Sequence, residues 1–168
     1  AAARTIAQRD RHVGYQSRVA VGAAVLGKIA VHRYVQHRQQ HVVDRGAEEA
    51  VEAMRYLEGM RLLIIGGGDV MPRLNRLVEQ YNLKERVIFK PKMPHHEMMQ
   101  YTRVCDLGLT LDKDTNINYR YSLPNKVFDY IHAGIPVLAS RLPEVEKIVK
   151  DYGVGDFIES HDPVHIAE

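Results

Sequence analysis

Apolar residues follow two patterns that alternate along the chain from Arg45 onward. In residues 47–57 the apolar side chains fall on one face of a helix and the charged side chains on the other, and Gly59 ends this pattern. Residues 62–65, Leu-Leu-Ile-Ile, are apolar throughout, which is typical of a strand that helices bury on both faces. Alternating helices and strands of this kind predict an α/β fold with a Rossmann-like, doubly wound parallel sheet.

The same patterns place the remaining elements, with proline and glycine residues at many of their boundaries. Residues 112–123 are polar and follow neither period, so they predict a long loop, and long loops in compact domains are usually functional or mobile. The pair Asp162-Pro163 predicts the start of a last helix. Helices are expected over residues 72–81, 95–104, 124–133 and 143–150, and strands over residues 87–89, 107–111 and 136–139.

Residues 1–44 fit the two patterns less clearly. Residues 19–26 and 28–35 are compatible with two strands or with one amphipathic helix, and we expect at least one strand here. The formal net charge of +2 is uneven, because residues 1–45 hold eight Lys and Arg against two acids and the rest of the chain holds fifteen against nineteen. A basic leader can bind nucleic acid or a membrane surface, but a solvated leader is the simpler interpretation, and we expect no nucleic-acid partner.

Composition narrows the class of protein. A chain of 168 residues with 45% hydrophobic content fits one domain with a core of its own. No apolar run reaches the length of a membrane span, and the N-terminal residues lack the pattern of a signal peptide. Cys105 is the single cysteine, which excludes an internal disulfide and a cysteine-based zinc site. We therefore expect a cytoplasmic protein, with attachment to the inner face of the membrane as an open alternative.

The candidate chemistry lies in loops, because ligands of open parallel sheets bind where loops leave the carboxyl ends of the strands. Ser122, Asn125 and Lys126 put a hydroxyl, an amide and an ammonium group at a helix N-terminus, where backbone N–H groups and the helix dipole favour a phosphate. Asp129 follows Lys126 by about one turn and is a natural partner of ribose hydroxyls. The alternative is that Ser122 or Asn125 only caps the helix while Lys126 and Asp129 are solvated.

Six short motifs occur in a specific order and spacing between Asp44 and about Pro163. They are Asp44-Arg45-Gly46, Leu63-Ile64-Ile65-Gly66-Gly67-Gly68, Arg86-Val87-Ile88-Phe89 with Pro94 just beyond, Cys105-Asp106-Leu107-Gly108-Leu109, Phe128-Asp129-Tyr130-Ile131-His132-Ala133-Gly134-Ile135-Pro136-Val137-Leu138-Ala139, and Pro143-Glu144-Val145. Through them roughly two-thirds of the chain resembles the C-terminal, donor-binding domain of retaining GT-B glycosyltransferases of the group-one, family-four class.

The resemblance implies roles for particular residues. The family places two acids separated by seven residues against the donor, and Asp129 matches the second acid, which holds the ribose hydroxyls. Tyr121 stands at the position of the first acid. Arg45 matches a basic residue that neutralises the donor diphosphate. The second basic residue of the family falls on Gln40, so Lys126 is expected to supply the second positive charge. We therefore assign catalysis to Arg45 and Lys126, and substrate binding to Asp129, Tyr121, Ser122 and Asn125.

Further substrate contacts are expected from two loops. The backbone around Lys92 and Met93 matches the family loop that holds the edge of the base, and the glycine turn around Gly67 follows a strand. Asp112 and Asp114 have the spacing of a metal-binding carboxylate pair but are expected on a flexible loop. We therefore expect no metal site. We also expect no cofactor, because the nucleotide sugar is a substrate and two cations can stabilise the departing diphosphate.

These features predict the donor-binding domain of a cytoplasmic glycosyltransferase that transfers a sugar from a nucleoside-diphosphate sugar to a glycan or lipid-linked acceptor in polysaccharide biosynthesis. Residues 1–40 are expected to form a basic leader that can contain a first strand, and residues 41–168 the donor domain. The acceptor domain is expected to lie outside this chain, which leaves the chain inactive by itself. A non-catalytic, Rossmann-like nucleotide- or partner-binding module is the alternative, since a fold does not fix a function.

Overall fold

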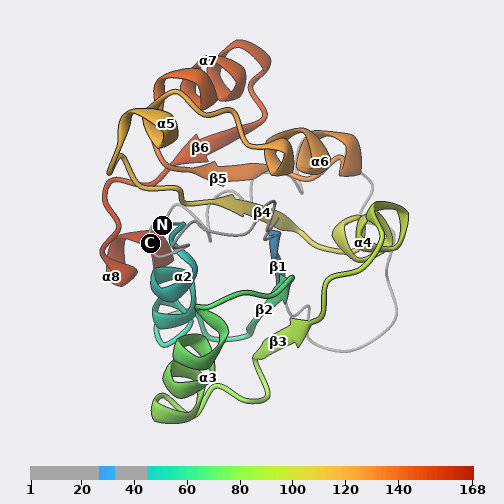
Figure 1. Ribbon diagram of the computed structural model, residues 1–168, viewed down its shortest axis with the longest axis vertical. Helices are drawn as coiled ribbons and strands as arrows, with labels where there is room; N and C mark the ends of the chain where they lie inside the picture. The colour runs from blue at the N-terminus through green and yellow to red at the C-terminus, as the bar shows by residue number, and fades with distance from the viewer. Residues whose placement is uncertain (1–26, 33–44) are drawn as a thin grey trace.

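The computed structural model describes residues 27–32 and 45–168 (Figure 1). The strand expected near the N-terminus is confirmed as β1 (Gly27–His32). Residues 19–26, Gln40 and most of the basic leader lie outside the described residues, so the predictions made for them stay predictions.

The other elements alternate along the chain as the hydrophobic pattern predicts. The pattern does not predict α5 and β6, because a four-residue helix and a three-residue edge strand are too short to show a period. The elements are α2 (Ala47–Ala53), β2 (Met60–Ile65), α3 (Met71–Gln80), β3 (Val87–Lys90), α4 (His95–Thr102), β4 (Leu107–Thr110), α5 (Ile117–Arg120), α6 (Asn125–Ala133), β5 (Val137–Ala139), α7 (Pro143–Tyr152), β6 (Gly155–Phe157) and α8 (Pro163–Ala167).

The strands form one parallel sheet in the order β3-β2-β1-β4-β5-β6. β1 lies near the centre, where Ile29 pairs with Leu62 of β2 and with Leu107 of β4. The strand order reverses between β1 and β4, and sheets of this kind bind ligands at the carboxyl ends of the strands beside such a reversal. The predicted Rossmann-like, doubly wound sheet is therefore confirmed.

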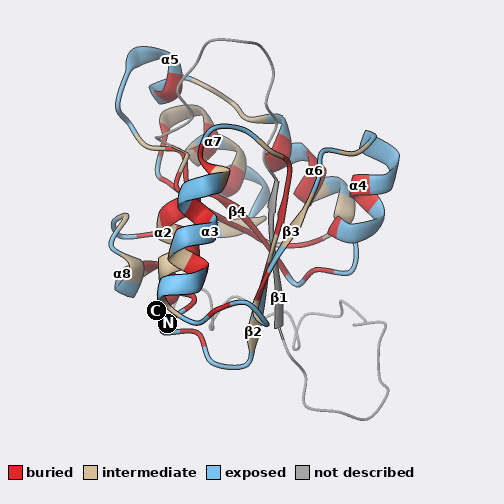
Figure 2. Cartoon of the chain, turned by 60° about the horizontal axis from the view of Figure 1, so that its bottom comes forward, coloured by how far each residue is buried: buried red, intermediate tan, exposed pale blue. Residues whose placement is uncertain are grey.

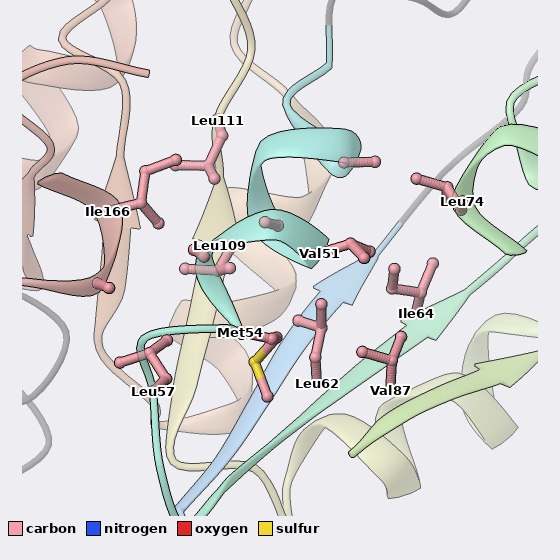
Figure 3. Packing of buried hydrophobic residues seen from close by; sticks show 14 of the residues in the cluster. Val51, Met54, Leu57, Leu62, Ile64, Leu74, Val87, Leu109, Leu111 and Ile166 are labelled. Atoms are coloured by element: carbon pink, nitrogen blue, oxygen red, sulfur yellow. The ribbon is translucent and has the colours of Figure 1, made fainter. Parts of the chain in front are cut away.

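Helices cover both faces of the sheet, because successive strand residues point to opposite faces. Leu62 and Ile64 of β2 pack into one buried cluster with Val51 of α2 (Figure 3). Ile65 packs on the other face, against Met98 of α4. Figure 1 shows α2, α3 and α8 on one side of the sheet and α4 and α6 on the other. Each buried aliphatic side chain contributes about 1.5–3 kcal/mol, which explains why residues 62–65 of β2 are apolar throughout.

The helices bury mainly the face that their hydrophobic pattern assigns to the sheet (Figure 2). In α3 the buried residues are Leu74 and Val78, which lie one turn apart on the same helix face. Within the described ranges, no helix combines the length and the apolar character that crossing a membrane requires.

α6 packs directly on β4 through Tyr130. This side chain is completely buried, and its hydroxyl donates a hydrogen bond to the carbonyl oxygen of Leu109 over 3.1 Å. A Cβ on Gly108 would lie 2.3 Å from Cγ of the Tyr130 ring. Gly108 therefore allows α6 to approach β4, and this approach brings the first turns of α6 to the carboxyl end of the strand.

Gly108→Ala should destabilise the protein, because the added methyl group overlaps the Tyr130 ring. Overpacking of this kind costs about 1–3 kcal/mol, so the free energy of unfolding in urea should fall by about that amount. Gly67→Ala is the matched control, since a Cβ there meets no heavy atom within 4 Å, and it should change the free energy by less than about 0.5 kcal/mol. Equal losses in the two variants would contradict the packing role of Gly108.

Candidate functional site

Gly46 fixes the position of Arg45 beside the end of β4. Gly46 is the N-cap residue of α2, and its φ of 70° is a left-handed conformation. A Cβ at this position would lie 2.4 Å from both the Cβ and the carbonyl oxygen of Leu111, so the site accepts only glycine without a shift. The start of α2 therefore lies against the residue that precedes Asp112, and Arg45 reaches that carboxylate.

Arg45, Asp112 and Lys126 form what we call the charged cluster. Arg45 Nη1 is 3.2 Å from Asp112 Oδ1, and Lys126 Nζ is 3.1 Å from Asp112 Oδ2. Thr110 Oγ1 also donates to Asp112 Oδ2, over 3.3 Å. Asp112 is completely buried, and a buried carboxylate remains charged at moderate cost only when cations and hydrogen bonds satisfy it in this way.

Asp112 lies in a loop, as predicted, but it is completely buried there. Its two cations hold it in the interior at the end of β4, and the segment that follows is anchored to α2. Lys113 forms an ion pair with Glu49 of α2. Tyr119 is 9% exposed, and its ring centroid is 4.9 Å from the guanidinium carbon of Arg45.

Asp112 and Asp114, the pair with metal-like spacing, have different partners. Asp112 faces the two cations of the charged cluster, whereas Asp114 is exposed and lies 3.6 Å from Nε of Arg120. Among residues 27–32 and 45–168, no three His, Cys, Asp or Glu side chains are grouped so that they could hold a metal ion.

Lys126 and Asp129 are three residues apart in α6 and therefore lie on the same side of the helix. Both are buried, with exposed fractions of 7% and 6%. Asp129 Oδ1 is 2.8 Å from Nε2 of His95, the first residue of α4. The alternative in which Lys126 and Asp129 are solvated is therefore wrong.

The capping alternative for Ser122 and Asn125 is also wrong. The N-cap residue of α6 is Pro124, and no side chain caps this end of the helix. Ser122 Oγ is buried without a hydrogen-bond partner in the part of the chain that the structure describes, and Asn125 is exposed in the first turn of α6. Neither side chain therefore forms a capping hydrogen bond with the start of α6.

The other predicted site residues lie in loops at the same edge of the sheet, because β2, β3 and β4 are parallel. Tyr121 ends α5 and is 58% exposed. Lys92 is exposed in the loop after β3, and Met93 beside it packs against the buried cluster of Ile65. Gly67 lies in the turn after β2, where an added Cβ would meet no heavy atom within 4 Å.

Two side chains that contact the predicted site residues cannot be identified from the sequence patterns. Asp112 immediately follows Leu111, the last apolar residue of its predicted strand, and that position is the signal that could identify it. His95 binds Asp129 across 34 residues of sequence, and no local pattern links the two.

The fold and the charged cluster together define a Rossmann-like α/β domain with a cationic site at the switch point of its sheet. The chain belongs to the family of group 1 glycosyl transferases, whose family model matches residues 35–168. This match confirms the resemblance drawn from the sequence motifs. A comparison with curated protein sequences finds no significant match.

Solved glycosyltransferase structures share the fold at low sequence identity. Sucrose-phosphate synthase from Thermosynechococcus elongatus is 22% identical with a TM-score of 0.67, over 84% of this chain and 34% of that chain. HepE from Anabaena in complex with UDP is 13% identical with a TM-score of 0.68, over 99% of this chain and 42% of that chain. The C-terminal domain of LpcC from Francisella tularensis is 16% identical with a TM-score of 0.64, over 84% of this chain and 71% of that chain. This chain therefore spans less than half the length of the first two proteins.

Lys126→Met should destabilise the protein, because it leaves the buried Asp112 carboxylate with one cation. Breaking a buried ion pair costs about 3–5 kcal/mol, and Arg45 retains part of the interaction, so the free energy of unfolding should fall by about 3 kcal/mol. Lys84→Met removes an exposed ion pair with Glu79 and should cost less than about 1 kcal/mol. Urea denaturation measures both values, and similar losses would contradict a structural role for the buried pair.

Proposed function

We propose that this chain is the donor-binding domain of a glycosyltransferase that transfers a sugar from a nucleoside-diphosphate sugar to a glycan or lipid-linked acceptor. The observation that carries the proposal is the meeting of Arg45 and Lys126, which are distant in the sequence, at the carboxyl end of β4. Membership of the group 1 family supports sugar transfer. HepE from Anabaena, which has a similar fold, was solved with UDP and with UDP-glucose, and this supports a nucleotide sugar as the donor.

The charged cluster is suited to a diphosphate. Two cations and one buried anion leave a net charge of +1, and Lys126 lies in the first turn of α6, where the helix dipole also favours an anion. The Arg45 side chain is 33% exposed, so its planar set of N–H donors can reach phosphate oxygens. When the glycosyl bond breaks, negative charge develops on the departing diphosphate, and cations that are already in place stabilise it.

Asp129 is suited to the nucleoside part of the donor. Its carboxylate is held by His95 from a second helix, so its orientation is set before a ligand binds. A carboxylate accepts hydrogen bonds from the adjacent hydroxyls of a ribose ring. In the proposed complex the backbone of Lys92 and Met93 holds the edge of the base, and Tyr121 lies beside the donor sugar.

Three other residues complete the proposed donor site. Ser122 and Asn125 offer a hydroxyl and an amide at the N-terminus of α6, close in sequence to the cation of Lys126. Gly67 leaves the turn after β2 open, so that the backbone there can approach the donor. These contacts add hydrogen bonds but no charge, so they orient the donor while the charged cluster binds its diphosphate.

The proposed reaction needs no metal ion and no cofactor, because Arg45 and Lys126 supply the positive charge that a metal ion provides in other enzymes. We place the enzyme in cytoplasmic polysaccharide biosynthesis, where a lipid-linked acceptor would bring it to the inner face of the membrane. This chain spans 34% and 42% of the two long structures that resemble it, so we assign acceptor binding to a second domain and expect no transfer by this chain alone.

Calorimetric titration of the chain with UDP, GDP and ADP tests the binding step. We expect binding of at least one of the three, weakened about tenfold or more by Arg45→Met, because hydrogen bonds to charged groups contribute about 1.5–3 kcal/mol. Arg61→Met is the matched control, since Arg61 is an exposed arginine near the amino end of β2, and it should leave the Kd unchanged. A folded wild-type chain that binds none of the three nucleotides would rule the proposal out.

A non-catalytic nucleotide- or partner-binding module of the same family is the second candidate. Tyr121 favours it, because an exposed tyrosine stands where the family has a donor-facing acid. Asp129→Ala in the full-length protein separates the two candidates, since an enzyme should lose about 100-fold in transfer rate if about 2.7 kcal/mol of transition-state stabilisation is lost. Asp156→Ala, on the edge strand β6, is the control and should keep the wild-type rate. Unchanged cellular function with Asp129→Ala would support the module.

A further inference from the structure

We propose that Asp112 is a positioning residue for the donor diphosphate. It holds Arg45 and Lys126 together before the donor binds, and its own charge limits how tightly these cations bind the diphosphate. This inference rests on the proposed function and adds to it a residue that the sequence motifs do not assign to the donor site.

The geometry makes Asp112 a fixed point between the two cations. Each carboxylate oxygen takes one cation, at 3.2 Å and 3.1 Å, and Thr110 of β4 anchors Oδ2 at 3.3 Å. Asp112 is 0% exposed, whereas the Arg45 side chain is 33% exposed. A diphosphate can therefore reach Arg45 from solvent, whereas the carboxylate that holds Arg45 is not exposed.

Asp112 has opposite effects on stability and on anion binding. Without its carboxylate, two cations would face each other in a largely buried site, which destabilises the folded chain. The same change raises the net charge of the charged cluster from +1 to +2 and removes a like charge near the diphosphate, which strengthens the attraction for an anion. If Asp112 acted only by holding the cations in place, its loss would lower both stability and affinity, so a gain in affinity shows that its charge limits anion binding.

A limited affinity for the diphosphate suits the proposed reaction. After transfer the nucleoside diphosphate remains bound and has to leave before the next donor binds, and product release often limits turnover. Asp112 keeps Arg45 and Lys126 aligned for the leaving group and, through its negative charge, favours the departure of the product. Preorganisation and product release therefore depend on the same carboxylate.

Asp112→Asn, which has nearly the same shape and no charge, tests the inference in the whole chain. The probes are inorganic pyrophosphate and the nucleoside diphosphate that the wild type binds, both titrated by calorimetry at one fixed ionic strength. We expect the Kd for pyrophosphate to fall by about tenfold, together with a lower urea midpoint. Asp114→Asn is the matched control, because Asp114 lies in the same segment, is exposed and pairs with Arg120, and it should change neither quantity.

The outcomes separate this inference from the proposed function. A folded Asp112→Asn variant that binds pyrophosphate as weakly as the wild type, or more weakly, would overturn the inference and leave the proposed function standing. A folded wild-type chain that binds neither pyrophosphate nor any nucleoside diphosphate would overturn both.

A second background keeps the test decisive if Asp112→Asn does not fold. In Lys126→Gln one cation is already absent, so the further loss of the Asp112 charge leaves Arg45 as the one charge of the charged cluster and raises its net charge from 0 to +1. The double variant should bind pyrophosphate about tenfold more tightly than Lys126→Gln alone. Equal or weaker binding by the double variant would overturn the inference.

Discussion

The buried carboxylate of Asp112 joins three parts of the chain that are far apart in sequence. Arg45 precedes α2, Asp112 follows β4, and Lys126 lies in the first turn of α6. An unpaired buried charge costs several kcal/mol, so the folded chain is most stable with both cations in place. The folded state therefore brings two cations to the switch point of the sheet, where the proposed diphosphate would bind.

Apolar packing sets the distances within this polar site. Gly46 lets the start of α2 lie against Leu111, and Gly108 lets the ring of Tyr130 lie against β4. In each case a Cβ would fall within 2.4 Å of its neighbour, so a larger residue would push a helix away from the strand. Ion pairs weaken as their partners separate, and the contacts of Asp112 thus depend on two glycines that carry no charge themselves.

The sequence predicts the sheet and the helix that carries Lys126 and Asp129, but it does not predict the long-range contacts. A wholly apolar run such as residues 62–65 can be buried only between two layers of helices, so the fold follows from the pattern. Lys126 and Asp129 can be placed at the start of a helix because Pro124 marks that start. The contacts of Asp112 cannot be predicted, because hydrophobic patterning treats a polar residue after a strand as solvated. Only the folded chain shows that Arg45, just before α2, and Lys126 of α6 converge on it.

The resemblance to the family places a second basic, donor-binding residue at position 40, where this chain has glutamine. Lys126 of α6 is the proposed replacement for that positive charge. It differs from a basic residue on a solvated loop in its burial, because its side chain is only 8% exposed. A buried ammonium group is stable in a folded chain when a carboxylate lies next to it, and Asp112 lies 3.1 Å from Lys126 Nζ. The fold therefore places Lys126 at the end of β4 together with an acid, so that Asp112 and Lys126 act as one unit.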